Sequence, residues 1–196
     1  QIPGQFSVYN GLCAATVCLA VGMEFDTVVA ALSAANGVKG RAEVVPTGRD
    51  FTVVIDYAHT PDALENVLTS IREIVKDKAQ VITVCGAGGN RDKGKRPLMA
   101  QEAAKYSDRV ILTSDNPRFE DPQEIIKDMV AGLDADQKRY TLTITDRREA
   151  IRTAVMLAQP GDVILVAGKG HEPYQDVQGT KHHFDDHEEV RAAFGE

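Results

Sequence analysis

The sequence predicts an α/β fold, with a doubly wound, mostly parallel sheet and helices on both of its faces. Apolar residues make up 43% of the 196-residue chain, which places it among globular proteins. From residue 51 onward, segments rich in Val and Ile alternate with amphipathic segments of helical length, and this alternation is typical of parallel sheets. Most strand segments are continuously apolar, as expected when both faces of a strand are buried.

Two helical segments precede the alternating region, at residues 9–21 and 26–35. Both are short and rich in apolar residues. A turn at residues 46–48 and nearby glycines then favour a linker. We therefore expect residues 1–40 to be the remnant of a preceding domain with its linker, and residues 41–196 to form the α/β domain. The chain starts with Gln rather than Met, and its first residues continue a sequence pattern whose beginning is missing. We therefore also expect it to be a fragment.

Five strands are expected in the α/β domain. They cover residues 51–56, 80–85, 109–114, 140–144 and 162–167. All but the fourth, which is more polar, are rich in Val and Ile. Between the first two, apolar residues recur every three or four positions from Leu64 to Val75, which predicts an amphipathic helix.

Aspartates mark the starts of further helices. Asp121 is followed by a proline at the first turn and precedes a segment with apolar residues that include Ile125 and Met129, a pattern typical of a helix N-terminus. Asp146 and Asp186 each precede a glutamate by three residues, which is the spacing of a capping box. We therefore expect two more helices to begin at these two positions.

Polar or glycine-rich sequences follow four of the predicted strands. They are residues 56–59, 86–96, 115–118 and 168–172. In open α/β sheets, ligands bind beyond the carboxyl ends of the strands. Short turns would suffice in a purely structural domain, so we predict that these four loops form one ligand site.

The second of these loops is open to more than one interpretation. Residues 89–95 match the G-x-x-x-x-G-K pattern of a phosphate loop, after a strand and before a helix. Arg96, however, occupies the position at which Ser or Thr would hold Mg²⁺. Charged or bulky side chains at residues 91–93 also disfavour a backbone wrapped around phosphates. We favour a cationic site for a carboxylate ligand, with a surface turn and a true phosphate loop as the alternatives.

The last two loops carry groups that suit an amino-acid ligand. Pro117 stiffens its loop, and the flanking Asn116 and Arg118 could face one ligand. A guanidinium binds a carboxylate through two parallel hydrogen bonds, although Arg118 could instead pair with an acidic residue two or three positions on. Gly168 allows close approach of the backbone, and Glu172 offers a carboxylate to an ammonium group.

Charge and composition exclude several classes of partner. The net charge is −7 without a basic tract, so we expect no nucleic acid as a partner. No apolar run reaches membrane-spanning length. Three cysteines without framework spacing indicate reduced thiols in a cytoplasmic protein. Histidines and aspartates at residues 182–187 resemble a metal cluster but lack a fixed ligand spacing, so a solvated strand and a helix cap are favoured.

Five sequence blocks, in this order, resemble the Mur ligases. They are residues 40–43, 56–62, 89–97, 115–118 and 167–172. The resemblance covers essentially the whole chain and points to the branch that adds meso-diaminopimelate to UDP-N-acetylmuramoyl-L-alanyl-D-glutamate. It implies a Rossmann-like C-terminal domain of a three-domain, ATP- and Mg²⁺-dependent ligase. It also implies a role in peptidoglycan biosynthesis, and so in cell shape, the cell cycle and cell division.

The resemblance implies two groups of binding residues. For ATP these are Asn10 near adenine, Arg41 near the phosphates, Asp56 on the ribose and His59 in the nucleotide site. The residues that would surround meso-diaminopimelate are Arg91, Asp115, Asn116, Pro117, Arg118, Gly168 and Glu172. The family's phosphate loop, modified lysine and Mg²⁺ ligands belong to a part that precedes this chain. We therefore expect no catalytic or metal-binding residue here, and no activity of the chain alone.

Two other functions remain open as alternatives. A P-loop NTPase or kinase would need a hydroxyl for Mg²⁺ where this chain has Arg96. A non-catalytic amino-acid-binding module would bind its ligand tightly without any further domain. A ligase fragment would bind only weakly, because half of its nucleotide site lies elsewhere.

Overall fold

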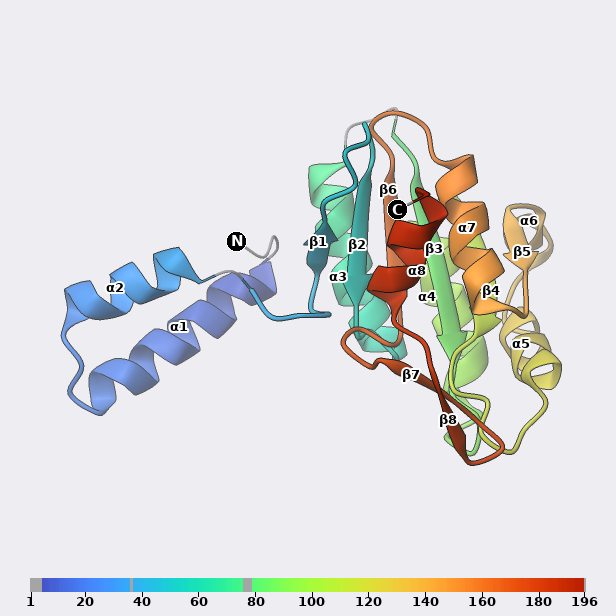
Figure 1. The fold of residues 1–196 in the computed structure, drawn as a ribbon, viewed down its shortest axis with the longest axis horizontal. Helices are drawn as coiled ribbons and strands as arrows, with labels where there is room; N and C mark the ends of the chain where they lie inside the picture. The colour runs from blue at the N-terminus through green and yellow to red at the C-terminus, as the bar shows by residue number, and fades with distance from the viewer. Residues whose placement is uncertain (1–4, 36, 76–78, 196) are drawn as a thin grey trace.

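The computed structural model describes residues 5–35, 37–75 and 79–195. A two-helix hairpin, α1 (Gln5–Ala20) and α2 (Phe25–Ala34), comes first and extends to one side of a layered α/β domain (Figure 1). Both helices lie close to their predicted ranges. None of the described helices combines the length and the apolar character that a membrane crossing requires.

In the described residues, the main sheet of the α/β domain has six strands in the order β1-β2-β6-β3-β4-β5. Their bounds are β1 (Glu43–Val45), β2 (Thr52–Asp56), β3 (Val81–Ala87), β4 (Arg109–Ser114), β5 (Thr141–Thr143) and β6 (Val163–Ala167). Every neighbouring pair is parallel except β1 and β2. The predicted α/β class and mostly parallel sheet are confirmed, and the antiparallel edge strand β1 is an addition to the prediction.

Helices cover both faces of the sheet. One face carries α3 (Pro61–Ile74), α4 (Lys95–Tyr106) and α5 (Pro122–Val130), and the other carries α7 (Arg147–Leu157) and α8 (Asp186–Ala193). The short α6 (Ala135–Arg139) leads into β5. Val54 of β2 packs with α3 residues such as Leu68, whereas the next residue, Ile55, belongs to the core on the opposite face. Alternate strand residues thus supply two separate cores, as a doubly wound fold requires.

A small antiparallel hairpin, β7 (Tyr174–Val177) and β8 (Thr180–His183), lies beyond the end of β3 (Figure 1). It is bonded to the loop after β4, because Arg118 N donates to Asp176 O at 2.9 Å and Gln178 N donates to Arg118 O at 2.7 Å. Strand β7 was not among the predicted strands. The exposed β8 agrees with the solvated strand expected at His182 and His183.

Two of the three predicted helix caps are confirmed. The Asp121 side chain accepts a hydrogen bond from Gln123 N at the start of α5, and Pro122 is its first residue. The Asp146 side chain accepts from Arg148 N and Glu149 N at the start of α7.

The third predicted cap is wrong by one residue. Asp185 caps α8, accepting from His187 N at 2.8 Å. Asp186 is instead fully buried and makes a bidentate ion pair with Arg147. The reason is tertiary: a buried guanidinium needs a carboxylate partner, and the neighbouring aspartate is free to cap the helix.

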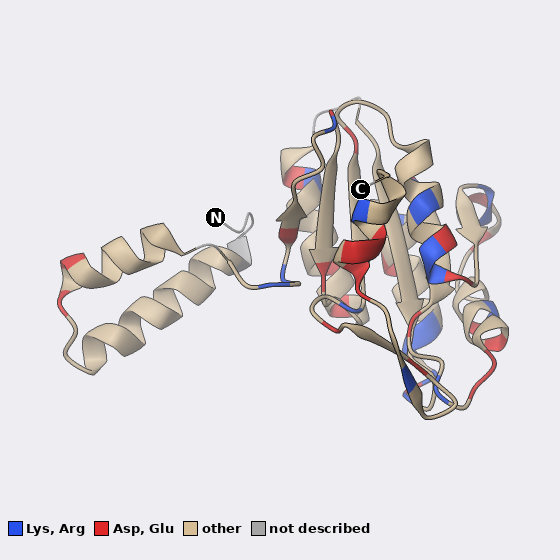
Figure 2. Cartoon of the chain, in the orientation of Figure 1, with Lys and Arg blue, Asp and Glu red and all other residues tan. Residues whose placement is uncertain are grey.

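The α1–α2 hairpin has an unusual surface. Its large apolar side chains are exposed along both helices, for example Leu12 at 59%, Val17 at 58% and Phe25 at 64%. Between residues 5 and 35 the only charged residues are Glu24 and Asp26. The hairpin is accordingly almost entirely tan in Figure 2, the colour of uncharged residues. Contiguous exposed apolar surface of this kind is typical of a face that packs against other protein.

Candidate functional site

The ends of four parallel strands form the rim of a polar cavity of about 380 Å³. The register of the parallel strands aligns their carboxyl ends. Asp56 of β2 pairs with Ala167 of β6, and Ala87 of β3 pairs with Ser114 of β4. The loop after each strand contributes to the cavity. The predicted convergence of the four loops is therefore confirmed.

Seven of the residues predicted to bind ligand line this cavity. They are His59, Arg91, Asp115, Asn116, Arg118, Gly168 and Glu172. Four others lie outside its lining. Pro117 is buried in its loop, and Asp56 is partly buried. Arg41 is exposed and stacks over the Tyr57 ring, and Asn10 is exposed on α1. The ligand-binding roles of all eleven stay predictions.

Four lining residues were missed by the sequence analysis as individual ligand-binding candidates. They are Tyr57, Gly88, Lys95 and Tyr174. Tyr57 and Lys95 lie in the blocks at residues 56–62 and 89–97, which carry the family resemblance. These blocks pointed to the site, but the binding roles were assigned to neighbouring residues. Tyr174 lies on β7, a strand that the sequence analysis did not predict.

Asn116 is held by a buried lysine. Lys169 is 0% exposed, and its Nζ donates to Asn116 Oδ1 at 3.0 Å and to Tyr174 O at 2.7 Å. The same ammonium lies 3.1 Å from Asp115 Oδ1. Gly168 precedes it with a φ of +120°, and a Cβ there would come 3.3 Å from Asp115 Oδ2. Glycine therefore lets the strand end turn close to this carboxylate.

Glu172 presents a carboxylate that is already oriented by the protein. Its Oε2 accepts from Asn116 Nδ2 at 3.0 Å and its Oε1 accepts from Tyr57 OH at 3.1 Å. Burial and the Glu172 carboxylate together raise the pKa of the Tyr57 phenol. Tyr57 is therefore a neutral hydrogen-bond donor at physiological pH.

Arg118 lines the cavity and forms no ion pair with Glu120 or Asp121, its two predicted competing partners. Its Nη1 donates to Gly89 O at 2.9 Å, and its Nε is 4.0 Å from Asp176 Oδ2. Glu120 instead pairs with Arg96, and Asp121 caps α5. The alternative in which Arg118 pairs with either of those two residues is therefore wrong.

The cavity carries both signs of charge. Arg91, Lys95 and Arg118 supply cations, and Asp115 and Glu172 supply carboxylates. Lys95 Nζ donates to His59 O at 2.8 Å. Burial lowers the pKa of Lys95, and the carboxylate of Asp115 opposes that effect. A cavity that pairs cations with carboxylates suits a zwitterionic ligand with separate ammonium and carboxylate groups.

Arg96 has a structural role. Its side chain is 1% exposed and donates to Glu120 Oε1 at 2.9 Å and to Asp128 Oδ2 at 2.8 Å. Hydrogen bonding to Arg96 is the main cause that lowers the pKa of Glu120 to about 2. The position that would hold the Mg²⁺ hydroxyl of a phosphate loop is thus occupied by an ion pair that joins α4 to α5. This geometry disfavours the phosphate-loop interpretation.

Asp56 already has protein partners. Its Oδ2 accepts from Ala42 N at 2.7 Å and its Oδ1 accepts from Ala58 N at 2.6 Å. Burial raises the pKa of Asp56, and the two amide hydrogen bonds act in the opposite direction. Each carboxylate oxygen has a second lone pair for a ligand.

The exposed Arg41 lies beside Tyr57, another residue of the loop after β2. Its guanidinium stacks on the Tyr57 ring, 4.8 Å from the ring centroid.

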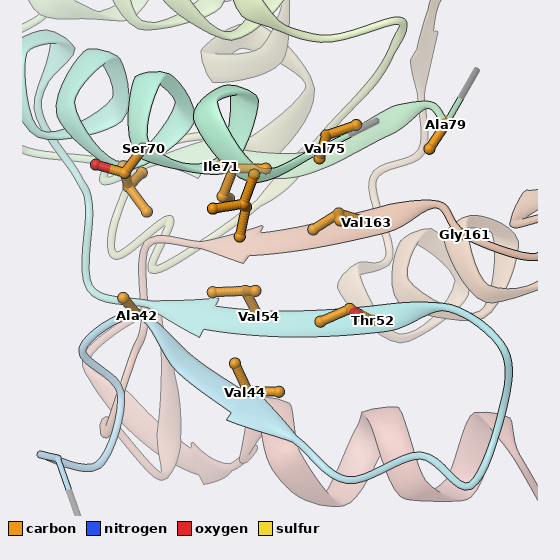
Figure 3. Close-up of a pocket in the computed structure, with 12 residues that line it drawn as sticks. Ala42, Val44, Thr52, Val54, Ser70, Ile71, Val75, Ala79, Gly161 and Val163 are labelled. Atoms are coloured by element: carbon orange, nitrogen blue, oxygen red, sulfur yellow. The ribbon is translucent and has the colours of Figure 1, made fainter. Parts of the chain in front are cut away.

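A second hollow, of about 280 Å³, lies between α3 and the β1–β2 edge of the sheet (Figure 3). Val54, Ile71 and Val163 point into it from two strands and the helix. Among the described residues, its lining includes no charged side chain. Because polar groups are needed to orient a substrate, the candidate site is the polar cavity and not this apolar hollow.

His183, Asp185, Asp186 and His187 near the C-terminus have partners within the protein. His183 Nε2 lies 2.6 Å from Glu188 Oε2, and His187 Nε2 lies 3.2 Å from Glu43 Oε2. In the part of the chain that the structure describes, no group of three or more His, Cys, Asp and Glu side chains is arranged to hold a metal ion. The exposed strand β8 and the helix cap formed by Asp185 fit the favoured interpretation as a solvated strand and a helix cap.

Comparison with known proteins gives a consistent result. Residues 40–170 match the family model described as Mur ligase, glutamate ligase domain. Over 194 residues the chain is 57% identical to the UDP-N-acetylmuramoyl-L-alanyl-D-glutamate--2,6-diaminopimelate ligase of Bacteroides fragilis, which covers 99% of this chain and 40% of that protein. The chain therefore spans about two fifths of the length of this relative.

Solved structures show the same similarity. A UDP-N-acetylmuramoyl-L-alanyl-D-glutamate--2,6-diaminopimelate ligase superposes with a TM-score of 0.77 at 44% identity, covering 98% of this chain and 39% of that chain. UDP-N-acetylmuramate-alanine ligase from Thermotoga maritima superposes with a TM-score of 0.64 at 21% identity, covering 85% and 35% of the two chains. At that identity, the second likeness supports the fold alone.

Proposed function

The chain belongs to the Mur ligase family, and on that premise we propose that it is the C-terminal part of an ATP-dependent ligase. The reaction would join meso-diaminopimelate to UDP-N-acetylmuramoyl-L-alanyl-D-glutamate in cytoplasmic peptidoglycan precursor synthesis. The observation that supports this substrate best is the polar cavity, whose lining includes both cations and carboxylates: Arg91, Lys95, Arg118, Asp115 and Glu172. Cell wall biogenesis, cell shape and division would depend on the product.

The arrangement of charge suits diaminopimelate. This amino acid has two ammonium and two carboxylate groups, and one amine must reach an activated carboxylate of the acceptor peptide. Glu172 and Arg118 both line the cavity. Glu172 would hold an ammonium group, and the guanidinium of Arg118 would bind a carboxylate. Cations near the reacting groups also stabilise negative charge that develops in the transition state.

ATP would supply the phosphoryl group that activates the acceptor carboxylate. The exposed Arg41 guanidinium, the Tyr57 ring beneath it and the exposed His59 lie together at the edge of the cavity. A cation and aromatic faces suit the phosphates and base of a nucleotide. We propose that the phosphate loop and the Mg²⁺ ligands belong to the part of the relatives that this chain does not cover.

The α1–α2 hairpin supports the proposed division into domains. Its exposed apolar side chains, such as Leu12 and Phe25, suit the interior of a larger unit. We propose that residues 1–40 complete a preceding ATPase domain and that residues 41–196 form the C-terminal domain. Asn10 would then reach the nucleotide from the preceding domain.

The proposed function is tested with the full-length protein that contains this chain. Purified protein should consume ATP when UDP-N-acetylmuramoyl-L-alanyl-D-glutamate and meso-diaminopimelate are both present, and should release the tripeptide product. A non-catalytic amino-acid-binding module would bind diaminopimelate but release no product. Absence of turnover with all three substrates and Mg²⁺ would refute the ligase assignment.

The 196-residue chain on its own should fold but neither hydrolyse ATP nor form a peptide bond. The physical reason is that Arg96 is buried in an ion pair where a phosphate loop would need a hydroxyl. The measurement is phosphate release by the purified chain, with Lys95→Ala as the matched variant. ATP turnover that disappears in Lys95→Ala would contradict the prediction and restore the phosphate-loop interpretation.

In the full-length protein, Asp56→Ala should raise the KM for ATP far more than the KM for diaminopimelate. Loss of charge-assisted hydrogen bonds to ribose costs about 1.5–3 kcal/mol, or roughly 10- to 150-fold. Because Asp56 also accepts from Ala42 N and Ala58 N, thermal unfolding of the variant must be measured in parallel. An ATP KM within twofold of wild type would show that Asp56 serves only to connect its neighbouring loops.

A further inference from the structure

Two side chains that contact Glu172 directly or through Asn116 have so far been given no role in binding the amino acid. One is Tyr57, after β2, and the other is Lys169, after β6. Tyr57 contacts Glu172 directly, and Lys169 contacts it through Asn116. Both come from strand ends that the fold brings together from distant parts of the chain.

Lys169 and the backbone N–H of Asp176 together determine which end of the Asn116 amide faces Glu172. Asn116 Oδ1 accepts from Lys169 Nζ at 3.0 Å and from Asp176 N at 2.9 Å. An ammonium and a backbone N–H can only donate, so the amide oxygen must face them. The Nδ2 group is then directed at Glu172 Oε2, 3.0 Å away.

Tyr57 is held in place by the groups packed around its ring. Arg41 stacks over it at 4.8 Å, and the rings of His59 and His171 lie 4.6 and 5.3 Å from its centroid. The phenol OH donates to Glu172 Oε1 at 3.1 Å. This packing connects the proposed nucleotide side of the site to the carboxylate on the amino-acid side.

We propose that Tyr57 and Lys169 are positioning residues that orient the Glu172 carboxylate to receive an ammonium group of the amino acid. The inference rests on the proposed ligase function. One donor occupies each oxygen of Glu172, Tyr57 on Oε1 and Asn116 on Oε2, and leaves the other lone pairs for the ligand. A carboxylate oriented before binding loses less side-chain entropy when the ligand arrives.

The first test is Tyr57→Phe in the full-length protein, which removes one oxygen atom and keeps the ring. The KM for meso-diaminopimelate should rise on the order of 10-fold, the effect of losing a hydrogen bond to a charged group. The KM for ATP should stay within about twofold, because the ring that Arg41 covers is unchanged. An unchanged KM for diaminopimelate would overturn the proposal for Tyr57.

Tyr106→Phe is the matched control. Tyr106 OH also donates to a glutamate, Glu65 Oε1 at 2.8 Å, but between α4 and α3 and outside the cavity lining. This variant should leave both KM values at the wild-type level. A KM for diaminopimelate that rises equally in Tyr57→Phe and Tyr106→Phe would indicate a general effect on stability and would also overturn the proposal.

A double-mutant cycle tests whether both residues act through Glu172. In a Glu172→Gln background, Tyr57→Phe should change the KM for diaminopimelate by less than about twofold, since the carboxylate it orients is gone. Lys169→Met should raise that KM in the wild-type background and likewise lose its effect in Glu172→Gln. Independent, multiplicative effects would overturn the proposal.

Lys169→Met removes a buried charge, and the variant could fail to fold. In that case the cycle of Tyr57→Phe with Glu172→Gln decides the question for Tyr57. In the cycle that pairs Lys169 with Glu172, Asn116→Ala then replaces Lys169→Met, because Lys169 contacts Glu172 through Asn116.

Different results would contradict the ligase activity and the positioning role of Tyr57. If the wild-type full-length protein does not use diaminopimelate with ATP, the proposed function is wrong. If it does, and Tyr57→Phe keeps the wild-type KM for diaminopimelate, the ligase assignment stands and the positioning role is wrong.

Discussion

Replacing Arg118 with alanine in the full-length protein should lower kcat/KM for meso-diaminopimelate by up to about 10⁴-fold, the discrimination that comparable hydrogen-bonding sites reach. The KM for ATP should not change. In the structure, Arg118 Nη1 is bonded to Gly89 O, and its side chain is 24% exposed at the cavity. The guanidinium therefore retains donors for a ligand carboxylate. Diaminopimelate and lysine differ by one distal carboxylate, so discrimination between them needs a group that binds it.

Arg118→Lys separates charge from geometry. It keeps a cation but loses the bidentate fork, so it should lose only part of the activity. Each variant is assayed with diaminopimelate and with L-lysine, and Arg152→Ala is the control because Arg152 makes an exposed pair with Glu149 on α7. If Arg118→Ala keeps the wild-type preference for diaminopimelate, Arg118 only connects its loop to Gly89 and Asp176.

Arg147→Met should lower the free energy of unfolding by about 3–5 kcal/mol, the cost of leaving one partner of a buried ion pair without its counter-charge. Arg147 and Asp186 are both 0% exposed in their side chains. Nε donates to Oδ1 at 2.8 Å and Nη2 donates to Oδ2 at 2.7 Å. Nη2 also donates to Ala167 O at 3.1 Å, at the strand end that leads into Gly168.

Urea unfolding followed by circular dichroism measures this loss. Arg152→Met, on the exposed face of the same helix, should change stability by less than about 1 kcal/mol. Adding Asp186→Leu to Arg147→Met should recover part of the loss, because two apolar side chains leave no buried charge. Stability of Arg147→Met within about 1 kcal/mol of wild type would show that water or another group replaces the guanidinium.

Two ion pairs between residues distant in the sequence illustrate what local sequence patterns leave undecided. Residues 89–95 match a phosphate-loop pattern, yet the side chain of Arg96 is buried and pairs with Glu120 and Asp128. Asp186 has the spacing of a helix cap, yet its carboxylate pairs with Arg147, 39 positions earlier. In both cases the local pattern was real, and a partner distant in the sequence decided the role of the side chain.

The sequence by itself determined the α/β class, the strands that alternate with helices, and the edge of the sheet at which polar groups gather. These properties follow from local periodicity and from the rule that the carboxyl ends of parallel strands share one edge. Only the tertiary structure decided the antiparallel edge strand β1, the β7–β8 hairpin and the contacts of Lys169 and Tyr57 with the groups around Glu172. Lys169 meets Asn116 across 53 positions, and Tyr57 meets Glu172 across 115. Such pairings depend on how strands are ordered in the sheet, which no local pattern of residues encodes.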